Sequence, residues 1–373
     1  MHFNEWWQLL FLAFCSITLI QLFYYLFFFI RLAFYKAKQK AVTQTHPVSV
    51  IICARDEAAN LVKNLPGSLV QKYNTTHEVI VVNDNSFDDT KYLLEKFKKE
   101  FKQLQVIELM QEAKLIPGKK FPLSIGIKTA KYEVVLLTDA DCVPASEHWI
   151  NCMQQTYDEN TEIILGYGAY HKLNGFLNKI IRWETFHTAI QYFSYALAGM
   201  PYMGVGRNLS YKKEVFYRHK GFSAHNNIPS GDDDLFVNMA ANKKNTKINI
   251  EKNAFTLSEP STTFSQWLKQ KNRHYSTSKH YRKLHKFLLG LYSLSHFLFY
   301  PLFAASIIFF SWKWSLVVFG TRFLVQLFVY YKCMKKLNEK DLYPYILLFD
   351  IGMFFYYLLF AFALIKKPRP TWK

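Results

Sequence analysis

The chain has 373 residues, enough for one large domain with additional segments, and 50% of them are hydrophobic and 18% aromatic. Its formal net charge of +18 is compatible with nucleic-acid binding, but no zinc-finger, RRM or KH signature accompanies the charge. We therefore expect no nucleic-acid partner, and we attribute the basic character to contact with anionic lipid headgroups and a phosphorylated substrate.

The first predicted element is a membrane anchor over residues 1–40. No charged side chain occurs from Trp6 to Ile30, a run long enough to cross a bilayer, and basic residues follow from Arg31 onward. The length of the run and the absence of a clear cleavage site disfavour a secretory signal peptide. The positive-inside rule places the end of this helix, and the domain that follows it, in the cytoplasm.

Three further apolar segments, at 287–312, 314–331 and 345–365, predict a C-terminal membrane region over 286–373. The flanking lysines and arginines indicate an integral protein of the plasma (inner) membrane with its soluble domain in the cytoplasm. Four full crossings would place the basic tail at 366–373 outside, which the same rule disfavours. One late segment is therefore a candidate for a re-entrant or interfacial helix.

Residues 41–285 form the predicted soluble domain, in which short strands alternate with helices. The strands are predicted at 47–53, 78–82, 105–108 and 133–138, and the helices at 58–70, 88–101 and 119–130. Alternation at this spacing is typical of a parallel, doubly wound α/β sheet. Ligands bind such sheets beyond the carboxyl ends of the strands.

Two carboxylates, Asp139 and Asp141, come directly after the last of these strands. Residues two apart on an extended chain point the same way, so the pair can present oxygens to one hard cation such as Mg²⁺ or Mn²⁺. An Asp-x-Asp tripeptide is common, and a solvated acidic turn explains it equally well in isolation.

Six motifs follow one another along the soluble domain and carry a more specific signal. They are SVIICARDEAANL, VIVVNDNSFDDT, GKKFPLSIGIKTAKYEVVLLTDAD, GVGRNLSYKKEVFYRHKGF, SGDDDLF and QKNRH. Together they resemble the inverting family 2 glycosyltransferases of the GT-A fold, a group that includes cellulose-synthase-like and ceramide-glucosyltransferase-like membrane enzymes. The resemblance covers essentially the whole soluble region.

The resemblance implies a donor site for a nucleotide-diphospho-sugar at the strand ends. Asp84 would accept hydrogen bonds from the base or ribose, although an aspartate there could simply cap its turn. Asp139 would contact the ribose or the metal, and Asp141 would hold Mg²⁺ or Mn²⁺ against the diphosphate. The other implied donor-binding residues are Asp56 and Glu57 near the base, and Arg273 near the diphosphate. Lys119 and Lys120 are also candidate phosphate neighbours, with a solvated basic helix start as the alternative.

The acidic run Asp232–Asp234 matches the family's catalytic base motif. Asp232 corresponds to the general base, Asp233 is the reserve candidate, and Asp234 is interpreted as structural. Adjacent carboxylates raise one another's pKa, which suits a group that takes a proton from an acceptor hydroxyl. A plain acidic helix cap is the alternative.

Three polar residues are implied at the acceptor site: Asn208, Gln270 and His274. His274 stands where the family's Gln-x-x-Arg-Trp signature has tryptophan. The change removes a large stacking surface for a sugar, which disfavours a growing polysaccharide as the acceptor.

The apolar stretch at 176–197 predicts one or two helices in the bilayer interface, with a buried core helix as the alternative. In the membrane region, Arg322 and Asp350 are costly unless they pair inside a bundle, so we predict a contact between them.

The expected protein is thus a membrane glycosyltransferase that transfers a sugar to a hydroxyl of a lipid or lipid-linked glycan acceptor. A processive polysaccharide synthase is the enzymatic alternative. A membrane scaffold that only binds nucleotide is the alternative from another class.

Overall fold

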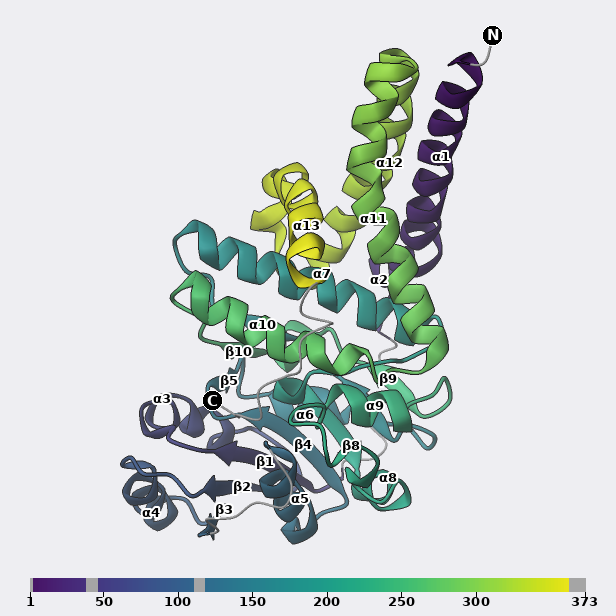
Figure 1. The fold of residues 1–373 in the computed structure, drawn as a ribbon. Helices are drawn as coiled ribbons and strands as arrows, with labels where there is room; N and C mark the ends of the chain where they lie inside the picture. The colour runs from purple at the N-terminus through teal and green to yellow at the C-terminus, as the bar shows by residue number, and fades with distance from the viewer. Residues whose placement is uncertain (1–2, 38–45, 111–117, 362–373) are drawn as a thin grey trace.

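The computed structural model of the protein describes residues 3–37, 46–110 and 118–361, with the backbone alone at 3–4, 274–276 and 360–361. Figure 1 shows an α/β domain at one end and long apolar helices that extend away from it at the other. Two helices, α7 (Phe176–Leu197) and α10 (Phe264–Ser278), lie between these parts.

The domain is built on a mixed seven-stranded sheet with the order β3-β2-β1-β4-β8-β6-β9. The first four strands in this order are mutually parallel, and β8 is antiparallel to both its neighbours. The strands are β1 (Val48–Ala54), β2 (His77–Asp84), β3 (Leu104–Leu109), β4 (Val134–Asp139), β6 (Ile163–Leu165), β8 (Leu209–Lys212) and β9 (Thr246–Ile248).

Helices cover both faces of this sheet, because β1 and its neighbours are apolar on both sides. Ile51 and Cys53 pack toward α5, whereas Val50 and Ile52 pack toward α3, α4 and α6. A Cβ at Gly126 would come within 2.7 Å of Ile51, so glycine lets α5 lie close on the sheet. The covering helices are α3 (Ala58–Leu69), α4 (Thr90–Glu100), α5 (Lys120–Thr129) and α6 (Trp149–Gln154).

These elements confirm the predicted α/β fold, with boundaries displaced by a few residues. The sequence did not reveal a second, three-stranded sheet of order β5-β10-β7, because its strands are only three residues long. They are β5 (Cys142–Pro144), β7 (Gly168–Tyr170) and β10 (Thr256–Ser258). The remaining elements of the domain are η2 (Gly206–Asn208), α8 (Lys213–Arg218), η3 (Ser223–His225), α9 (Asp234–Ala240) and η4 (Lys252–Ala254).

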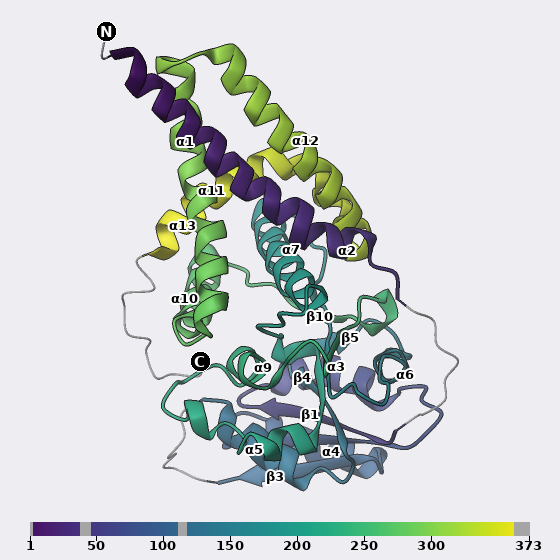
Figure 2. The same cartoon turned by 90° about the vertical axis from the view of Figure 1, so that its right-hand side faces the viewer.

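Four helical stretches of the described chain are long and apolar enough to cross a membrane: Glu5–Phe34, Lys283–Phe309, Trp312–Lys336 and Lys340–Leu359. Figure 2 shows α1, α11 and α12 extending away from the sheet on the same side. The elements of this region are α1 (Phe3–Phe23), η1 (Tyr24–Phe29), α2 (Ile30–Phe34), α11 (Lys283–Phe309), α12 (Trp312–Lys336), η5 (Lys340–Tyr345) and α13 (Ile346–Ala361).

The last of these helices, α13, lies above α7 and crosses it instead of extending with the other three (Figures 1 and 2). Near its start, Phe349 stacks on Trp183 of α7 with ring centroids 5.1 Å apart. Near its described end, Tyr356 donates a hydrogen bond to Glu184 of α7 at 3.3 Å. Both ends of the helix therefore contact the layer that separates the domain from the apolar helices.

The predicted contact between Arg322 and Asp350 is present and ties α12 to α13. Both side chains are buried, and the guanidinium makes two hydrogen bonds to the carboxylate, one of them from Nη2 at 3.1 Å. Gln326 donates to the same carboxylate at 2.6 Å, and Arg322 donates from Nε to Gln21 of α1 at 2.7 Å. A buried ion pair is tolerated when hydrogen bonds satisfy its remaining groups, as they do here.

Candidate functional site

The carboxyl ends of β1, β2 and β4 meet at one edge of the main sheet, and several charged groups gather there. Asp84 ends β2 and is fully buried, and Asp139 ends β4 in register with Cys53 of β1. Burial raises the pKa of the Cys53 thiol to about 12, and the charges of Lys119, Asp232, Asp139 and Asp84 all act on it. Groups that are far apart in the sequence are therefore close together around the end of β1.

Lys119 lies at the centre of this cluster and forms a salt bridge with Asp139. Burial would lower the pKa of the ammonium, but Asp139 and Asp232 hold it well above its usual value. Burial would likewise raise the pKa of Asp139, but Lys119, Arg207 and Arg273 hold it below its usual value. Lysine and aspartate are thus both charged.

Asp139, Asp141 and Cys142 offer ligand atoms that all lie within 4.8 Å of one another. Two carboxylates at this spacing fit a hard divalent cation such as Mg²⁺ or Mn²⁺. Burial raises the pKa of the Cys142 thiol well above its usual value, and its Sγ donates a hydrogen bond to Asp141 at 3.3 Å. The thiol therefore supports Asp141 as a neutral donor, and the carboxylates are the metal-ligand candidates.

The three carboxylates of the acidic run at the start of α9 have two different roles, one structural and one a candidate for catalysis. Asp233 accepts hydrogen bonds from the backbone N–H of Gly206 at 2.7 Å and of Asp234 at 2.7 Å. Asp234 is buried and accepts from the hydroxyls of Thr277 and Tyr281 on and beside α10. These bonds hold the segment in place and leave Asp232, which is partly exposed, as the candidate base.

For Asp233 these bonds indicate a positioning role in place of the catalytic role that the motif allowed. Burial, followed by the neighbouring Asp232, raises its pKa to about 8. Asp234 matches its interpretation as a structural residue, since its carboxylate joins α9 to α10.

The QKNRH motif lies on α10, between the α/β domain and the apolar helices (Figure 1). Arg273 is close enough to act on the pKa of Asp139, and Gln270 donates a long hydrogen bond, 3.5 Å, to the hydroxyl of Tyr170. Lys271 forms a buried salt bridge with Glu184 of α7, which fixes the orientation of α10. The side chain of His274 lies outside the described residues.

Trp267 does not take the place of the tryptophan that the motif lacks at position 274. Its side chain is 2% exposed and packs between Phe264 and Tyr356, with centroids 5.2 and 6.0 Å away. It contributes to the packing of α10 against α13.

Two predicted binding residues are in the protein interior instead of at a ligand surface. Asn208 is fully buried, and it donates to the carbonyls of Tyr167 and Ala254 and accepts from Trp149. Both polar atoms of its side chain form hydrogen bonds inside the fold. The acceptor-binding prediction for Asn208 is therefore corrected to a structural role.

Lys120 is the second of these residues and is also fully buried. Its Nζ donates to the carbonyls of His225 at 2.5 Å and Ile228 at 2.8 Å. Helix α5 turns adjacent residues in different directions, so Lys119 faces the acidic cluster and Lys120 holds the 225–228 loop. The diphosphate candidate is therefore Lys119 in place of Lys120.

Asp56 and Glu57 connect the first two strand-end loops. Asp56 has a φ of +53° and accepts from the backbone N–H of Phe87 at 2.8 Å, while its own N–H donates to Ser86. The N–H of Glu57 donates to Thr90 at 3.1 Å. These bonds join the loop that follows β1 to the loop that follows β2.

Arg207 is a charged residue of this region that the sequence reasoning missed. It lies between Gly206 and Asn208 in η2, its guanidinium is 4.4 Å from the ring centroid of Tyr170, and its charge acts on both Asp139 and Asp141. The GVGRN motif contained the signal, since arginine is the charged residue of that segment.

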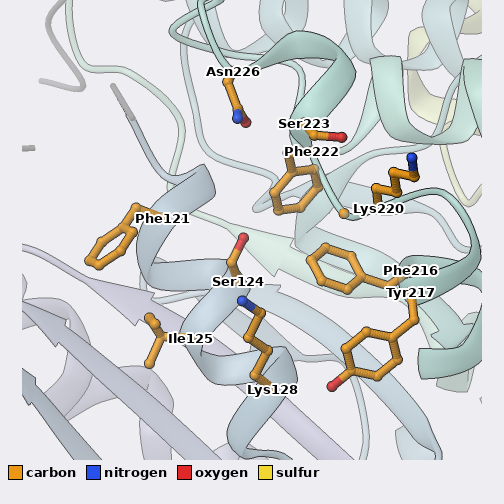
Figure 3. A pocket seen from close by; sticks show the side chains of 11 residues that line it. Phe121, Ser124, Ile125, Lys128, Phe216, Tyr217, Lys220, Phe222, Ser223 and Asn226 are labelled. Atoms are coloured by element: carbon orange, nitrogen blue, oxygen red, sulfur yellow. The ribbon is translucent and has the colours of Figure 1, made fainter. Parts of the chain in front are cut away.

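A cavity of about 390 Å³ lies away from the acidic cluster, between α5 and α8 (Figure 3). Aromatic rings of Phe121, Phe216 and Phe222 line it, together with Lys128 and Lys220. None of the site residues predicted from the sequence lines this cavity.

Comparison with known proteins identifies the domain that carries the acidic cluster. Residues 49–220 match the family model described as Glycosyl transferase family 2. Residues 49–220 therefore resemble a family 2 glycosyltransferase domain. The match begins in β1 and includes the strand ends with Asp84, Asp139 and Asp141.

Curated proteins with different names match part of this domain. The chain is 31% identical over 111 residues to a beta-monoglucosyldiacylglycerol synthase from Nostoc sp., covering 29% of this chain and 23% of the relative. It is 29% identical over 120 residues to a poly-beta-1,6-N-acetyl-D-glucosamine synthase from Staphylococcus aureus, covering 31% and 28%. The matched stretch spans about a quarter of the length of these relatives.

Among solved structures, the chain is similar to a mannosyltransferase from Pyrobaculum calidifontis in complex with GDP-Man and Mn²⁺. The alignment covers 91% of this chain and 99% of that one, with a TM-score of 0.55 and 15% identity. The predicted GT-A fold is confirmed by this likeness and by the family match.

Proposed function

We propose that this protein is a membrane-bound inverting glycosyltransferase. It transfers a sugar from a nucleotide-diphospho-sugar to a hydroxyl of a lipid or lipid-linked acceptor. The observation that carries the proposal is the convergence of Asp84, Lys119, Asp139 and Asp232 around the end of β1. Asp141, next to Asp139, completes the pair that fits a divalent cation.

Each group has a separate task in the proposed reaction. Asp84, with the loops that Asp56 and Glu57 hold, binds the nucleoside, and Lys119 and Arg273 neutralise the diphosphate. Asp139 and Asp141 would hold Mg²⁺ or Mn²⁺, which would supply positive charge against the negative charge of the diphosphate leaving group. Asp232 takes the proton from the acceptor hydroxyl, which attacks the sugar from the opposite face. One displacement inverts the anomeric centre.

The acceptor reaches this site from the side of α7 and α10 in our proposal. Helix α10, which carries Gln270 and Arg273, lies between the α/β domain and the apolar helices (Figure 1), and Lys271 anchors that helix to Glu184 of α7. The similarity to a glucosyldiacylglycerol synthase favours a lipid acceptor.

The second candidate function is a processive polysaccharide synthase, which the similarity to a poly-beta-1,6-N-acetyl-D-glucosamine synthase favours. Chain-length analysis of the product separates the two: single transfer gives one added sugar for each acceptor, and a polymer series would support the synthase. Four or fewer membrane helices are few for a wide translocation channel, so we favour single transfer.

We further propose that α1, α11 and α12 cross the membrane and that α13 stays at its cytoplasmic surface. Three crossings place the catalytic domain and the basic residues 366–373 on the same, cytoplasmic side, as the positive-inside rule requires. In this proposal α13 is the late interfacial segment. Labelling of single cysteines introduced after residue 366 tests the orientation: a tail that reacts only after the membrane is opened supports it.

The enzyme assignment is tested with purified protein and a panel of nucleotide sugars. Asp232→Asn is expected to bind nucleoside diphosphate with Mn²⁺ normally and to lose transfer. Equal loss of binding and transfer would indicate that Asp232 serves the fold.

A further inference from the structure

The guanidinium of Arg207 is held in a slot that other residues build for it. Gly168 of β7 lies under the side chain, and a Cβ at that position would come within 2.3 Å of the Arg207 Nε. Tyr170, two residues on and therefore on the same face of the strand, lies against the guanidinium at 4.4 Å from ring centroid to Cζ. The glycine makes room for the arginine stem, and the tyrosine ring supports the charge.

The backbone on both sides of Arg207 is fixed as well. Asp233 accepts from the N–H of Gly206 at 2.7 Å, and Asn208 is locked by three hydrogen bonds in the core. A surface arginine that only neutralises acidic neighbours does not need this support. The arginine is thus preorganised, and its orientation does not depend on a ligand.

The charge of Arg207 acts on both carboxylates of the candidate metal site without a salt bridge to either of them. Tyr170 is in register with Ser258, and Ser258 with Cys142, the residue after Asp141. The three-stranded sheet therefore connects the tyrosine that contacts Arg207 to the candidate metal site. Among the described residues, no carboxylate lies within salt-bridge range of Arg207, and its buried Nε has no hydrogen-bond partner. Asp139 pairs with Lys119 instead.

We infer that Arg207 binds a phosphate oxyanion of the substrate, next to the metal and on the side that faces α10. This inference rests on the proposed function and names a further contact within the same site. Guanidinium groups bind phosphate through two parallel N–H donors, and a desolvated, preoriented guanidinium does so at little entropic cost. The oxyanion belongs either to the donor diphosphate or to a phosphate headgroup on the acceptor, and the two sources are separated below.

The test compares wild type, Arg207→Gln and Arg207→Lys by isothermal titration calorimetry. The first probe is UDP or GDP with Mn²⁺, with uridine or guanosine as the matched probe without phosphate. The second probe is dihexanoyl phosphatidic acid, with dihexanoylglycerol as the uncharged control. Arg207→Gln is expected to weaken one phosphate probe about 10- to 100-fold, the effect of losing a charge-assisted bidentate contact, and to leave the uncharged probe unchanged. Arg207→Lys is expected to recover part of the loss.

Gly168→Ala is the second variant, because it keeps the arginine but closes the slot. We expect it to weaken the same probe as Arg207→Gln does. Thermal unfolding of each variant separates loss of binding from loss of fold, and Arg207→Gln alone decides the inference if Gly168→Ala does not fold.

Loss of UDP or GDP binding alone assigns Arg207 to the donor, and loss of phosphatidic acid binding alone assigns it to the acceptor. Phosphate binding in Arg207→Gln that stays within about twofold of wild type for both probes would overturn the inference and leave the proposed function standing. A wild-type protein that binds neither probe would overturn both.

Discussion

Lys119 forms a salt bridge with Asp139, whereas Lys120, the next residue along α5, donates to the backbone carbonyls of the 225–228 loop. Lys119 balances the charge of Asp139 in the site, and Lys120 stabilises the fold. The pair therefore offers a matched experiment on chemistry and structure.

Lys119→Met is expected to weaken binding of a nucleoside diphosphate by 10-fold or more, because an ammonium facing the diphosphate is lost, while the melting temperature changes little. Lys120→Met removes the donor to the carbonyls of His225 and Ile228 and so releases the 225–228 loop from α5. We expect that variant to lose stability. Calorimetric binding and thermal unfolding of both variants check this, and the reverse pattern would show that the two lysines had been assigned the wrong way round.

Asp141→Asn is expected to abolish specific Mn²⁺ binding, because an amide replaces the carboxylate that burial and Asp139 leave with a raised pKa and no lysine partner. Electron paramagnetic resonance of Mn²⁺ measures free and bound metal directly. Cys142→Ser keeps a hydrogen-bond donor to Asp141 and serves as the control, with metal affinity close to wild type. Retention of Mn²⁺ by Asp141→Asn would place the metal elsewhere.

Asp233 gives a predicted pH dependence of stability. Its folded pKa is about 8, whereas an unfolded aspartate has a pKa of about 3.9, so the folded state binds the proton more tightly. The contribution to the free energy of unfolding is fully present below about pH 4 and is lost as the pH rises toward about 8. Asp233→Asn is expected to flatten the fall in melting temperature over this range.

Asp89→Asn, at an exposed aspartate, is the control for this experiment and should keep the wild-type profile. A slope that is the same in Asp233→Asn and wild type would show that Asp233 is ionised in the folded protein. The backbone N–H groups of Gly206 and Asp234 would then donate to an ionised carboxylate.

Arg322→Leu is expected to destabilise the membrane region by about 3–5 kcal/mol, because it leaves the buried carboxylate of Asp350 without its charged partner. The double variant Arg322→Leu, Asp350→Leu removes both charges and should regain most of that loss. Unfolding in detergent micelles measures the cycle. A double variant as unstable as Arg322→Leu would indicate that the pair itself contributes net stability.

Much of the domain could be predicted from the sequence, because parallel strands buried on both faces leave continuous apolar runs. The strands at β1, β2, β3 and β4 and the helices between them were located within a few residues. The carboxylates at the strand ends followed from the topology, since parallel strands end at the same edge. The Arg322–Asp350 contact followed from the cost of a lone charge in lipid.

The errors concern side-chain direction, which periodicity does not specify. Asn208 and Arg207 are neighbours in a 3-10 turn, and the turn directs the asparagine into the core and the arginine toward the site. The same uncertainty left both Lys119 and Lys120 as candidate phosphate neighbours at the start of α5, and the structure separates their contacts. The small sheet that supports Arg207 was missed because strands of three residues have no recognisable alternation.

The central claim is that the acidic cluster transfers a sugar from a nucleotide-diphospho-sugar. The most direct measurement is release of nucleoside diphosphate from a panel of nucleotide sugars by the full-length protein in lipid vesicles, with Mn²⁺ or with chelator. We predict release from at least one donor that requires the metal and is lost in both Asp141→Asn and Asp232→Asn. Release that persists in Asp141→Asn and Asp232→Asn, or no release from any donor in the presence of Mn²⁺ and membrane lipid, would contradict the account.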